Sequence, residues 1–193
     1  DAVVKRFVLA KRFAHVAAEL LGVPSVRLYH DQALFKEPGG GHTPWHQDQF
    51  YWPLETDATV TLWMPLVDAG PEMGTMTFAS GSHAEGFIPI DEQISDTSEA
   101  FFDRYVAEKG YTLEGAGAMR AGDATFHTGW CLHRAPGNPT DRVREVMTII
   151  YYADGALAKE PANEFQRADL ATWLPGVQPG QAAASGLNPV VAP

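Results

Sequence analysis

The sequence has little cysteine, little positive charge and no long apolar run. Its single cysteine, Cys131, excludes an intrachain disulfide and is compatible with a reducing cytoplasm. Fourteen Lys and Arg against 24 Asp and Glu leave a net charge of -10. That balance argues against nucleic acid and anionic membranes as partners, because both are bound through basic patches. With no bilayer-spanning run and no secretion signal in the first residues, we expect a cytoplasmic protein that binds small molecules.

The length and composition predict one globular domain over residues 1–193, since 193 residues with 45% hydrophobic content suffice for a substantial core. Residues 1–22 are expected to form a flanking helix. Its amphipathic part runs from Val3 to Leu21, with Gly22 and Pro24 as stop signals. The apolar residues expected to share its buried face are Val4, Phe7, Val8, Val16, Leu20 and Leu21.

Short segments that favour strands follow, separated by turn-forming residues. Strands are predicted over residues 26–36, 46–51, 59–67 and 75–79, near 124, and over 144–152; turns are predicted at 37–41 and 70–74. A helical insert is expected at about 91–110, closed by Gly110, and residues 175–193 are expected to form a loosely ordered tail. The pattern predicts a mainly β fold with flanking helices: a jelly roll, or double-stranded β-helix, over residues 26–152.

The sequence His46-Gln47-Asp48 is the first candidate metal site. On an extended strand, residues two apart project to the same side, so His46 and Asp48 can bind one ion together. His133 adds a second histidine, and Arg144 opens the apolar segment that ends at Tyr152. Two histidines and one carboxylate occupy one face of an octahedral ion and leave positions for other ligands, as in non-haem Fe(II) oxygenases. A nearby arginine can hold a cosubstrate carboxylate through two hydrogen bonds.

These motifs resemble the phytanoyl-CoA dioxygenase-like family of Fe(II)/2-oxoglutarate-dependent oxygenases. The resemblance rests on the segment from Pro44 to Pro53, on Trp63, on Ser80-Gly-Ser-His83, and on Leu132-His133 followed by Arg144. It implies that His46, Asp48 and His133 bind iron and that Arg144 pairs with the distal carboxylate of 2-oxoglutarate. It further implies that Trp63 and Gln32 line the cosubstrate pocket. One departure is that Arg134 directly follows the distal histidine, where relatives often carry a small hydroxyl residue or glycine.

Several other residues compete for these roles. His83 and Glu85 form a second His-x-carboxylate pair, but they follow a turn-forming stretch. His127 precedes His133 by six residues and is interpreted as a structural histidine. Arg142 would share a strand face with Arg144, so only the resemblance separates the two. His42 is expected in solvent, and Cys131 is interpreted as a small buried hydrophobe.

The resulting hypothesis is a dioxygenase that uses Fe(II), 2-oxoglutarate and O2, releases succinate and CO2, and hydroxylates a small metabolite. Relatives that halogenate replace the carboxylate ligand with a small residue, whereas this chain keeps Asp48. The absence of a Lys/Arg cluster disfavours a coenzyme A thioester, so an apolar or zwitterionic substrate is expected. Two alternatives stay open: a cupin-type metal enzyme that does not use 2-oxoglutarate, and a non-catalytic jelly-roll domain that binds small molecules.

Overall fold

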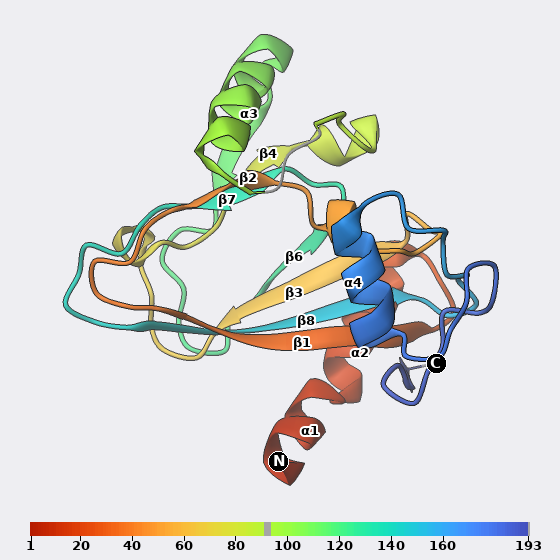
Figure 1. The fold of residues 1–193 in the computed structure, drawn as a ribbon. Helices are drawn as coiled ribbons and strands as arrows, with labels where there is room; N and C mark the ends of the chain where they lie inside the picture. Colours follow the sequence, from red (N-terminus) through yellow and green to blue (C-terminus); the bar gives the residue numbers. More distant parts are fainter. Residues whose placement is uncertain (91–93, 193) are drawn as a thin grey trace.

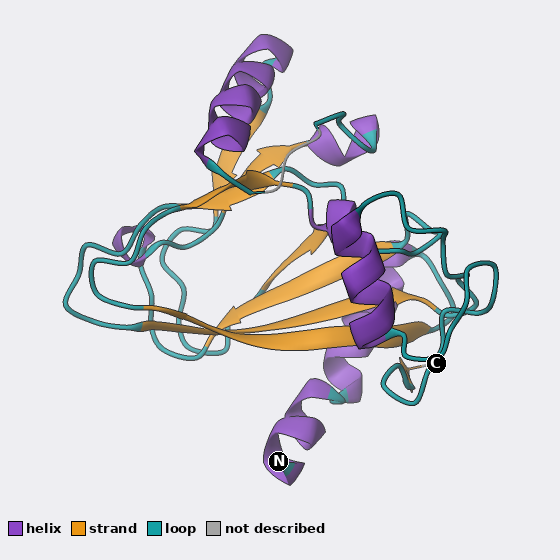
Figure 2. Cartoon of the chain, in the orientation of Figure 1, coloured by secondary structure: helices purple, strands orange, loops and turns teal. Residues whose placement is uncertain are grey.

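The computed structural model describes residues 1–90 and 94–192 as two antiparallel β-sheets with helices around them (Figure 1). The larger sheet has the strand order β6-β3-β8-β1-β9 and the smaller sheet the order β2-β7-β4-β5. Figure 2 shows helices outside both sheets, while the strands form the two layers. The prediction of a mainly β jelly roll with flanking helices is confirmed.

The larger sheet contains the longest strands, β1 (Val26–Lys36) and β8 (Arg144–Ala153), which pair along nearly their whole length. β3 (Thr59–Pro65) pairs with β8 on one side and with β6 (Thr125–Thr128) on the other, and β9 (Val190–Ala192) pairs with β1. Every residue of β3 is buried, as expected for a central strand covered on both faces.

The smaller sheet consists of short strands: β2 (Thr43–His46), β7 (His133–Ala135), β4 (Thr77–Ser80) and β5 (Thr112–Gly115). In the described residues, 3₁₀ helices follow β2, β3 and β4: η1 (Asp48–Tyr51), η2 (Pro71–Met73) and η3 (Ser82–Glu85). The pairing of β2 with β7 places His46 directly opposite His133. Two residues that are 87 positions apart in the sequence thus become neighbours.

The predicted N-terminal helix is wrong in its continuity and in its buried face. The chain forms α1 (Ala2–Val8) and α2 (Lys11–Leu21), with a break at Leu9 and Ala10. Val4, Val16 and Leu20 are exposed, although they were assigned to the buried face. The residues of α2 that pack against the larger sheet are instead the smaller Ala14, Ala17 and Ala18, together with Phe13. The break changes which residue positions face the sheet, so a single helical periodicity cannot predict the buried residues of both helices.

The predicted strand over residues 46–51 is also wrong. β2 ends at His46, Gln47 is extended, and Asp48 begins the 3₁₀ helix η1. Buried Gln47 fixes this change of direction, because its Nε2 donates to the carbonyls of Gly86 and Trp130 at 2.8 and 2.7 Å. The proposed ligands therefore converge through a turn between two elements and not through strand alternation.

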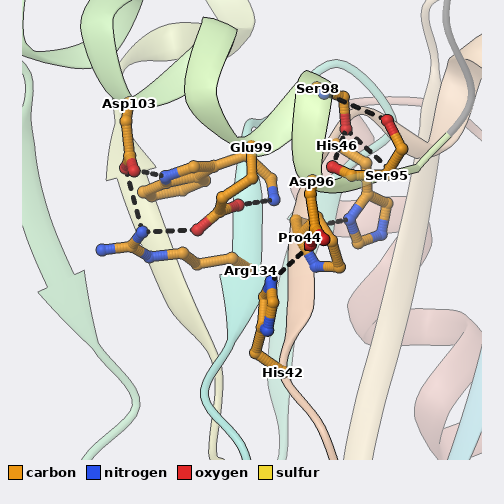
Figure 3. A network of polar contacts seen from close by, with 10 residues as sticks. His42, Pro44, His46, Ser95, Asp96, Ser98, Glu99, Asp103 and Arg134 are labelled. Atoms are coloured by element: carbon orange, nitrogen blue, oxygen red, sulfur yellow. Dashed lines mark hydrogen bonds and ion pairs between the residues drawn. The ribbon is translucent and has the colours of Figure 1, made fainter.

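The helical insert begins later than predicted. α3 runs over Asp96–Lys109, capped by Ser95 at its start and by Gly110 in the left-handed region at its end. The first three residues of the predicted insert, 91–93, lie outside the described residues. Figure 3 shows how α3 is attached to the smaller sheet: Glu99 accepts from the backbone N–H of Trp45, and Arg134 donates to Glu99. Asp103 accepts from both the Trp45 indole and Arg134. Arg134, which directly follows His133, therefore helps to attach α3 to the smaller sheet.

The tail is packed, so the expectation of a loosely ordered segment over residues 175–193 is wrong for the described part, up to residue 192. Ala183 and Val177 are buried in one core cluster with Tyr29 and Tyr152. Asn188 is fully buried and donates to the carbonyls of Leu28 and Tyr29. Small residues lack the periodicity that would reveal such burial in the sequence. No helix in the described parts of the chain is long and apolar enough to cross a membrane.

Candidate metal and cosubstrate site

A cavity of about 320 Å³ lies between the two sheets. Its wall contains all six residues that sequence analysis selected, and several more. The lining residues used below are His30, Gln32, His46, Asp48, Tyr51, Trp52, Thr61, Trp63, His127, His133, Arg144, Asp169 and Trp173. We call the part near Trp63 and Arg144 the Arg144 end, and the part near His30, Asp169 and Trp173 the Asp169 end.

His46, Asp48 and His133 form a compact cluster in the wall of this cavity. Asp48 Oδ1 lies 3.5 Å from His46 Nε2 and 3.6 Å from His133 Nε2, and one donor atom from each residue lies within 4.8 Å of the others. Ligands bonded about 2.1 Å from a shared ion lie roughly 3.0–3.5 Å apart in neighbouring positions. The spacing of the cluster therefore suits a single transition-metal ion.

The hydrogen bonds of the two imidazoles determine which nitrogen faces the cluster. His46 Nδ1 lies 2.8 Å from the carbonyl oxygen of Pro44, and His133 Nδ1 lies 2.9 Å from that of Cys131. A carbonyl only accepts, so each Nδ1 carries the proton and each Nε2 presents a lone pair. When both imidazoles are neutral, three acceptor atoms face one another with no hydrogen between them. A bound cation would turn this repulsion into attraction, and the carbonyls are the outer partners typical of metal-bound histidine.

The protonation of the cluster is consistent with metal binding. Burial, reinforced by the His46 and His127 rings, lowers the pKa of His133 well below its ordinary value. Burial acts to raise the pKa of Asp48, but the surrounding histidines outweigh it and hold that pKa well below its usual range. Both directions favour the deprotonated side chains that a metal ion requires.

Two residues hold the other oxygen of Asp48. Thr61 Oγ1 donates to Asp48 Oδ2 at 2.8 Å, and His127 Nε2 lies 3.3 Å from the same oxygen. His127 is buried at the back of the cluster, and its ring centroid lies 4.3 Å from that of His133. His127 therefore contacts two candidate ligands, Asp48 and His133. Its interpretation as a structural histidine did not specify these contacts.

Arg144 lies at one end of the cavity as an isolated cation. It is 5% exposed, its Nη1 donates to the Gly74 carbonyl at 2.5 Å, and its Nε is buried without a hydrogen bond. Among residues 1–90 and 94–192, no carboxylate forms an ion pair with it. A buried guanidinium without an acidic partner is costly, so this end of the cavity is suited to an anionic ligand. Trp63 lies beside it, with the guanidinium carbon 5.3 Å from the ring centroid.

The structure separates the competing residues. His83 and Glu85 are exposed in η3, where Glu85 pairs with Lys109, and His42 is exposed near Asp96. Arg142 precedes β8 and is exposed, so the two arginines do not share a strand face.

Cys131 is buried, and burial raises the pKa of its thiol to about 11, in agreement with its interpretation as a hydrophobe. Trp63 and Gln32, which the family resemblance places at the cosubstrate, both line the cavity.

The residues at the opposite end of the cavity were not predicted from the sequence. Asp169 and Trp173 lie on α4 (Glu164–Trp173), which was not predicted, and His30 lies on β1. A local signal for α4 exists: Asn163 precedes an acidic first turn, and its side chain accepts from the Gln166 N–H. No local signal links Asp169 to His30, because 139 residues separate them.

Known proteins resemble this chain in sequence. A sequence model of the phytanoyl-CoA dioxygenase family, PhyH, matches residues 1–146. The methylphosphonate hydroxylase of Gimesia maris is 29% identical over 162 residues, which are 81% of this chain and 57% of that protein. A probable alpha-ketoglutarate-dependent hypophosphite dioxygenase of Stutzerimonas stutzeri is 29% identical over 80 residues, or 42% of this chain and 28% of that protein. The chain therefore spans little more than half of the first relative.

Two solved structures are similar along almost the whole chain. The non-heme alpha-ketoglutarate-dependent epimerase SnoN from nogalamycin biosynthesis is 27% identical with a TM-score of 0.81, covering 100% of this chain and 74% of that one. The carbocyclase SnoK from nogalamycin biosynthesis is 27% identical with a TM-score of 0.78, covering 97% of this chain and 70% of that one. Another SnoN structure contains Fe3+, alpha-ketoglutarate and nogalamycin RO.

The family match extends over about three quarters of the chain and includes every residue that sequence analysis selected for the site. The structural relatives named above depend on iron or alpha-ketoglutarate and share the two-sheet fold. Similarity in sequence, similarity in fold and a cluster of two histidines and one aspartate lead to one conclusion. This chain belongs to the phytanoyl-CoA dioxygenase (PhyH) family of Fe(II)/2-oxoglutarate-dependent oxygenases.

Proposed function

We propose that this protein is an Fe(II)- and 2-oxoglutarate-dependent dioxygenase that hydroxylates a small molecule and releases succinate and CO2. One observation carries the proposal: a single cavity holds three converging donor residues and, at one end, a buried arginine that has no acidic partner in the described parts of the chain. A dicarboxylate that binds a metal through one end and pairs with a cation through the other would satisfy both features. The structural relatives that use alpha-ketoglutarate support this assignment.

In this proposal, His46, Asp48 and His133 hold the metal, while Thr61 and His127 keep Asp48 oriented. Arg144 pairs with the distal carboxylate of 2-oxoglutarate, and Trp63 and Gln32 flank it. When bound, the iron would supply oxidising power for a substrate C–H bond, with O2 as the oxidant and 2-oxoglutarate as the source of two electrons. The contribution of the chain is to place both organic molecules beside the metal.

Hydroxylation is the reaction we propose, because Asp48 keeps a carboxylate at the position that halogenating relatives leave open for a halide. The similar epimerase and carbocyclase indicate that this fold also directs other outcomes of the same oxidative chemistry. A small metabolite is the proposed substrate, and the cytoplasm is the proposed location. Both proposals agree with the acidic composition of the chain.

Anaerobic titration of the Fe(II)-loaded protein with 2-oxoglutarate tests the proposal. Chelation of the metal by the cosubstrate produces a weak charge-transfer band in the visible region, and the band reports affinity. We expect Arg144→Ala to weaken that affinity by about 50-fold or more, because its anion-binding group is lost. Arg142→Ala is the matched control: it removes the same charge two residues away from an exposed position, and we expect no change.

Each contrary outcome identifies a specific error. Iron binding without a band would favour a cupin-type enzyme that does not use 2-oxoglutarate. Failure of the folded protein to bind iron would refute the metal assignment and favour a non-catalytic binding domain. Equal effects of the Arg144 and Arg142 variants would show that the cosubstrate carboxylate binds elsewhere.

A further inference from the structure

The Asp169 end of the cavity has chemistry that the metal and 2-oxoglutarate do not use. α4 packs through Leu170 and Trp173 against the core cluster that contains Ile150 and Tyr152 of β8. Ile150, which lines the cavity there, follows Arg144 by six residues, or about 20 Å along an extended strand. The Asp169 end is therefore well separated from the buried arginine and borders the other side of the metal cluster.

An irregularity in β1 makes this end polar. The pairing of β1 with β8 shifts between Leu28 and Asp31, so Leu28, Tyr29 and His30 are buried in succession where a regular strand would alternate. His30 consequently enters the cavity wall, where its ring stacks on Trp173 with centroids 4.5 Å apart. It is 8% exposed, and its Nδ1 is buried without a hydrogen bond.

Asp169 supplies a carboxylate that no cation among the described residues neutralises. Its Oδ2 accepts a hydrogen bond of 2.9 Å from Tyr29 Oη, and Oδ1 has no hydrogen-bond partner in the described parts of the chain. None of the lysines or arginines described forms an ion pair with Asp169. Burial raises its pKa to about 6, which leaves the group mostly ionised at neutral pH. Both α4 residues, Asp169 and Trp173, lie beyond the segment that the family model matches.

We infer that His30, Asp169 and Trp173 form a substrate-recognition subsite that binds a protonated amine of the primary substrate. This inference rests on the proposed function, because it assigns the organic substrate to the end of the cavity that 2-oxoglutarate leaves free. The Asp169 carboxylate pairs with the ammonium, and the free Nδ1 of His30 accepts one of its hydrogens. Tyr51, Trp52 and Trp173 provide the aromatic surroundings that favour a cation over a neutral group.

The charges at the Asp169 end also argue against an anionic substrate group there. An anionic substrate group at this end would face an unpaired carboxylate and an imidazole whose pKa burial lowers to about 4. Neither group offers a positive charge at neutral pH. The cavity thus has a cation at one end and a carboxylate at the other, and a 2-oxoglutarate dianion and an amine would each have a preferred end.

Calorimetric titration of the Fe(II)-loaded, 2-oxoglutarate-bound protein under anaerobic conditions tests the subsite. The probes are benzylammonium and benzyl alcohol, which are nearly isosteric and differ in charge at about pH 7.5. We expect the wild type to bind benzylammonium about ten-fold more tightly than the alcohol, as for one charge-assisted hydrogen bond. In Asp169→Asn, which can still accept from Tyr29, we expect the two affinities to become equal within about two-fold.

The matched control is Glu108→Gln, which removes one negative charge from an exposed position of α3. We expect it to keep the ten-fold preference. A second variant, Trp173→Leu, should weaken benzylammonium more than benzyl alcohol, since a cation gains more from the aromatic face. Thermal unfolding of every variant confirms that a folded protein is compared.

Two readings in the same sample separate the inference from the proposed function. A normal 2-oxoglutarate charge-transfer band with no preference for the amine would overturn the subsite alone. An unchanged preference in Asp169→Asn would also overturn it. Absence of the band in the wild type would refute the proposed function instead, whatever the amine titration gives.

Discussion

The two ends of the cavity are built in opposite ways. At the Arg144 end, the polar group is a cation held by one backbone carbonyl, beside Trp63 and the first residues of β8. At the Asp169 end, the polar group is a carboxylate held by one tyrosine hydroxyl, on a helix outside the sheets. The metal cluster borders both. In the proposed function, residues of the sheets would hold the cosubstrate, while an added helix would contribute to substrate selection.

The largest effect should come from removing the residue on which both ends depend. We expect Asp48→Ala to weaken Fe(II) binding by more than about 100-fold, because the cluster loses its carboxylate and keeps only two imidazole ligands. Equilibrium binding of Fe(II) under anaerobic conditions measures the effect. The exposed Glu108→Gln variant is the control, and comparable iron affinities in the two variants would contradict the metal assignment.

The next prediction separates charge from geometry at the Arg144 end. Arg144→Lys keeps a positive charge but loses the planar fork that can bind a carboxylate through two hydrogen bonds. We expect 2-oxoglutarate affinity to fall by about ten-fold, which is less than for Arg144→Ala. The charge-transfer titration measures it, with Arg142→Lys as the control. A lysine variant as weak as the alanine variant would show that geometry accounts for the whole effect.

A third prediction concerns the pH dependence of stability at the Asp169 end. Burial raises the pKa of Asp169 from 3.8 to about 6, so the folded state prefers the protonated carboxyl. The stability gained from that proton is complete below about pH 4 and is lost as the pH rises through about 6. As the pH rises from about 4.5 to 7, we therefore expect the wild type to lose stability relative to Asp169→Asn.

Urea unfolding of both proteins at the two pH values measures this trend. The lowered pKa of His30, caused mainly by burial, has the opposite dependence: its stabilising effect is lost as the pH falls from about 6.5 through 4. Because the wild type and the variant both contain His30, that contribution largely cancels in the comparison. A stability difference that does not change with pH would contradict the burial of an ionisable Asp169.

The smallest effect is expected from a region that belongs to neither end. Glu99 accepts from the Trp45 backbone and from Arg134, and it holds α3 on the smaller sheet (Figure 3). We expect Glu99→Gln to cost about 1–2 kcal/mol of unfolding free energy, through loss of a partly buried ion pair and a charge-assisted hydrogen bond. Thermal unfolding measures it. A change in 2-oxoglutarate or benzylammonium affinity would show that α3 also shapes the cavity.

The sequence predicted the Arg144 end far better than the Asp169 end. The separate motifs around His46, His133 and Arg144 each have a chemical reason to occur, and their order in the chain is informative. The strand argument for His46 and Asp48 was nevertheless wrong, because buried Gln47 turns the chain between them. The convergence of His46, Asp48 and His133 agrees with what residue chemistry and the family resemblance together led us to expect, and not with the local geometry that we assumed.

The Asp169 end depends on features that have no local signature. A shift in strand register brings His30 inside, and β-bulges of this kind depend on pairing between distant strands. The tail was misjudged for a related reason: Ala183 and Asn188 look like loop residues, yet tertiary contacts bury both. The fold class could be derived from strand and turn signals, whereas the substrate end required the three-dimensional packing of α4.

The most direct test of the opposed ends is a crystal structure of the anaerobic protein with Fe(II), 2-oxoglutarate and benzylammonium, with anomalous scattering measured at the iron edge. We predict an iron peak bounded by His46, Asp48 and His133. We also predict the distal carboxylate of 2-oxoglutarate at Arg144 and the ammonium within hydrogen-bond distance of Asp169. A carboxylate of 2-oxoglutarate at the Asp169 end, or iron bound away from the three residues, would contradict these predictions.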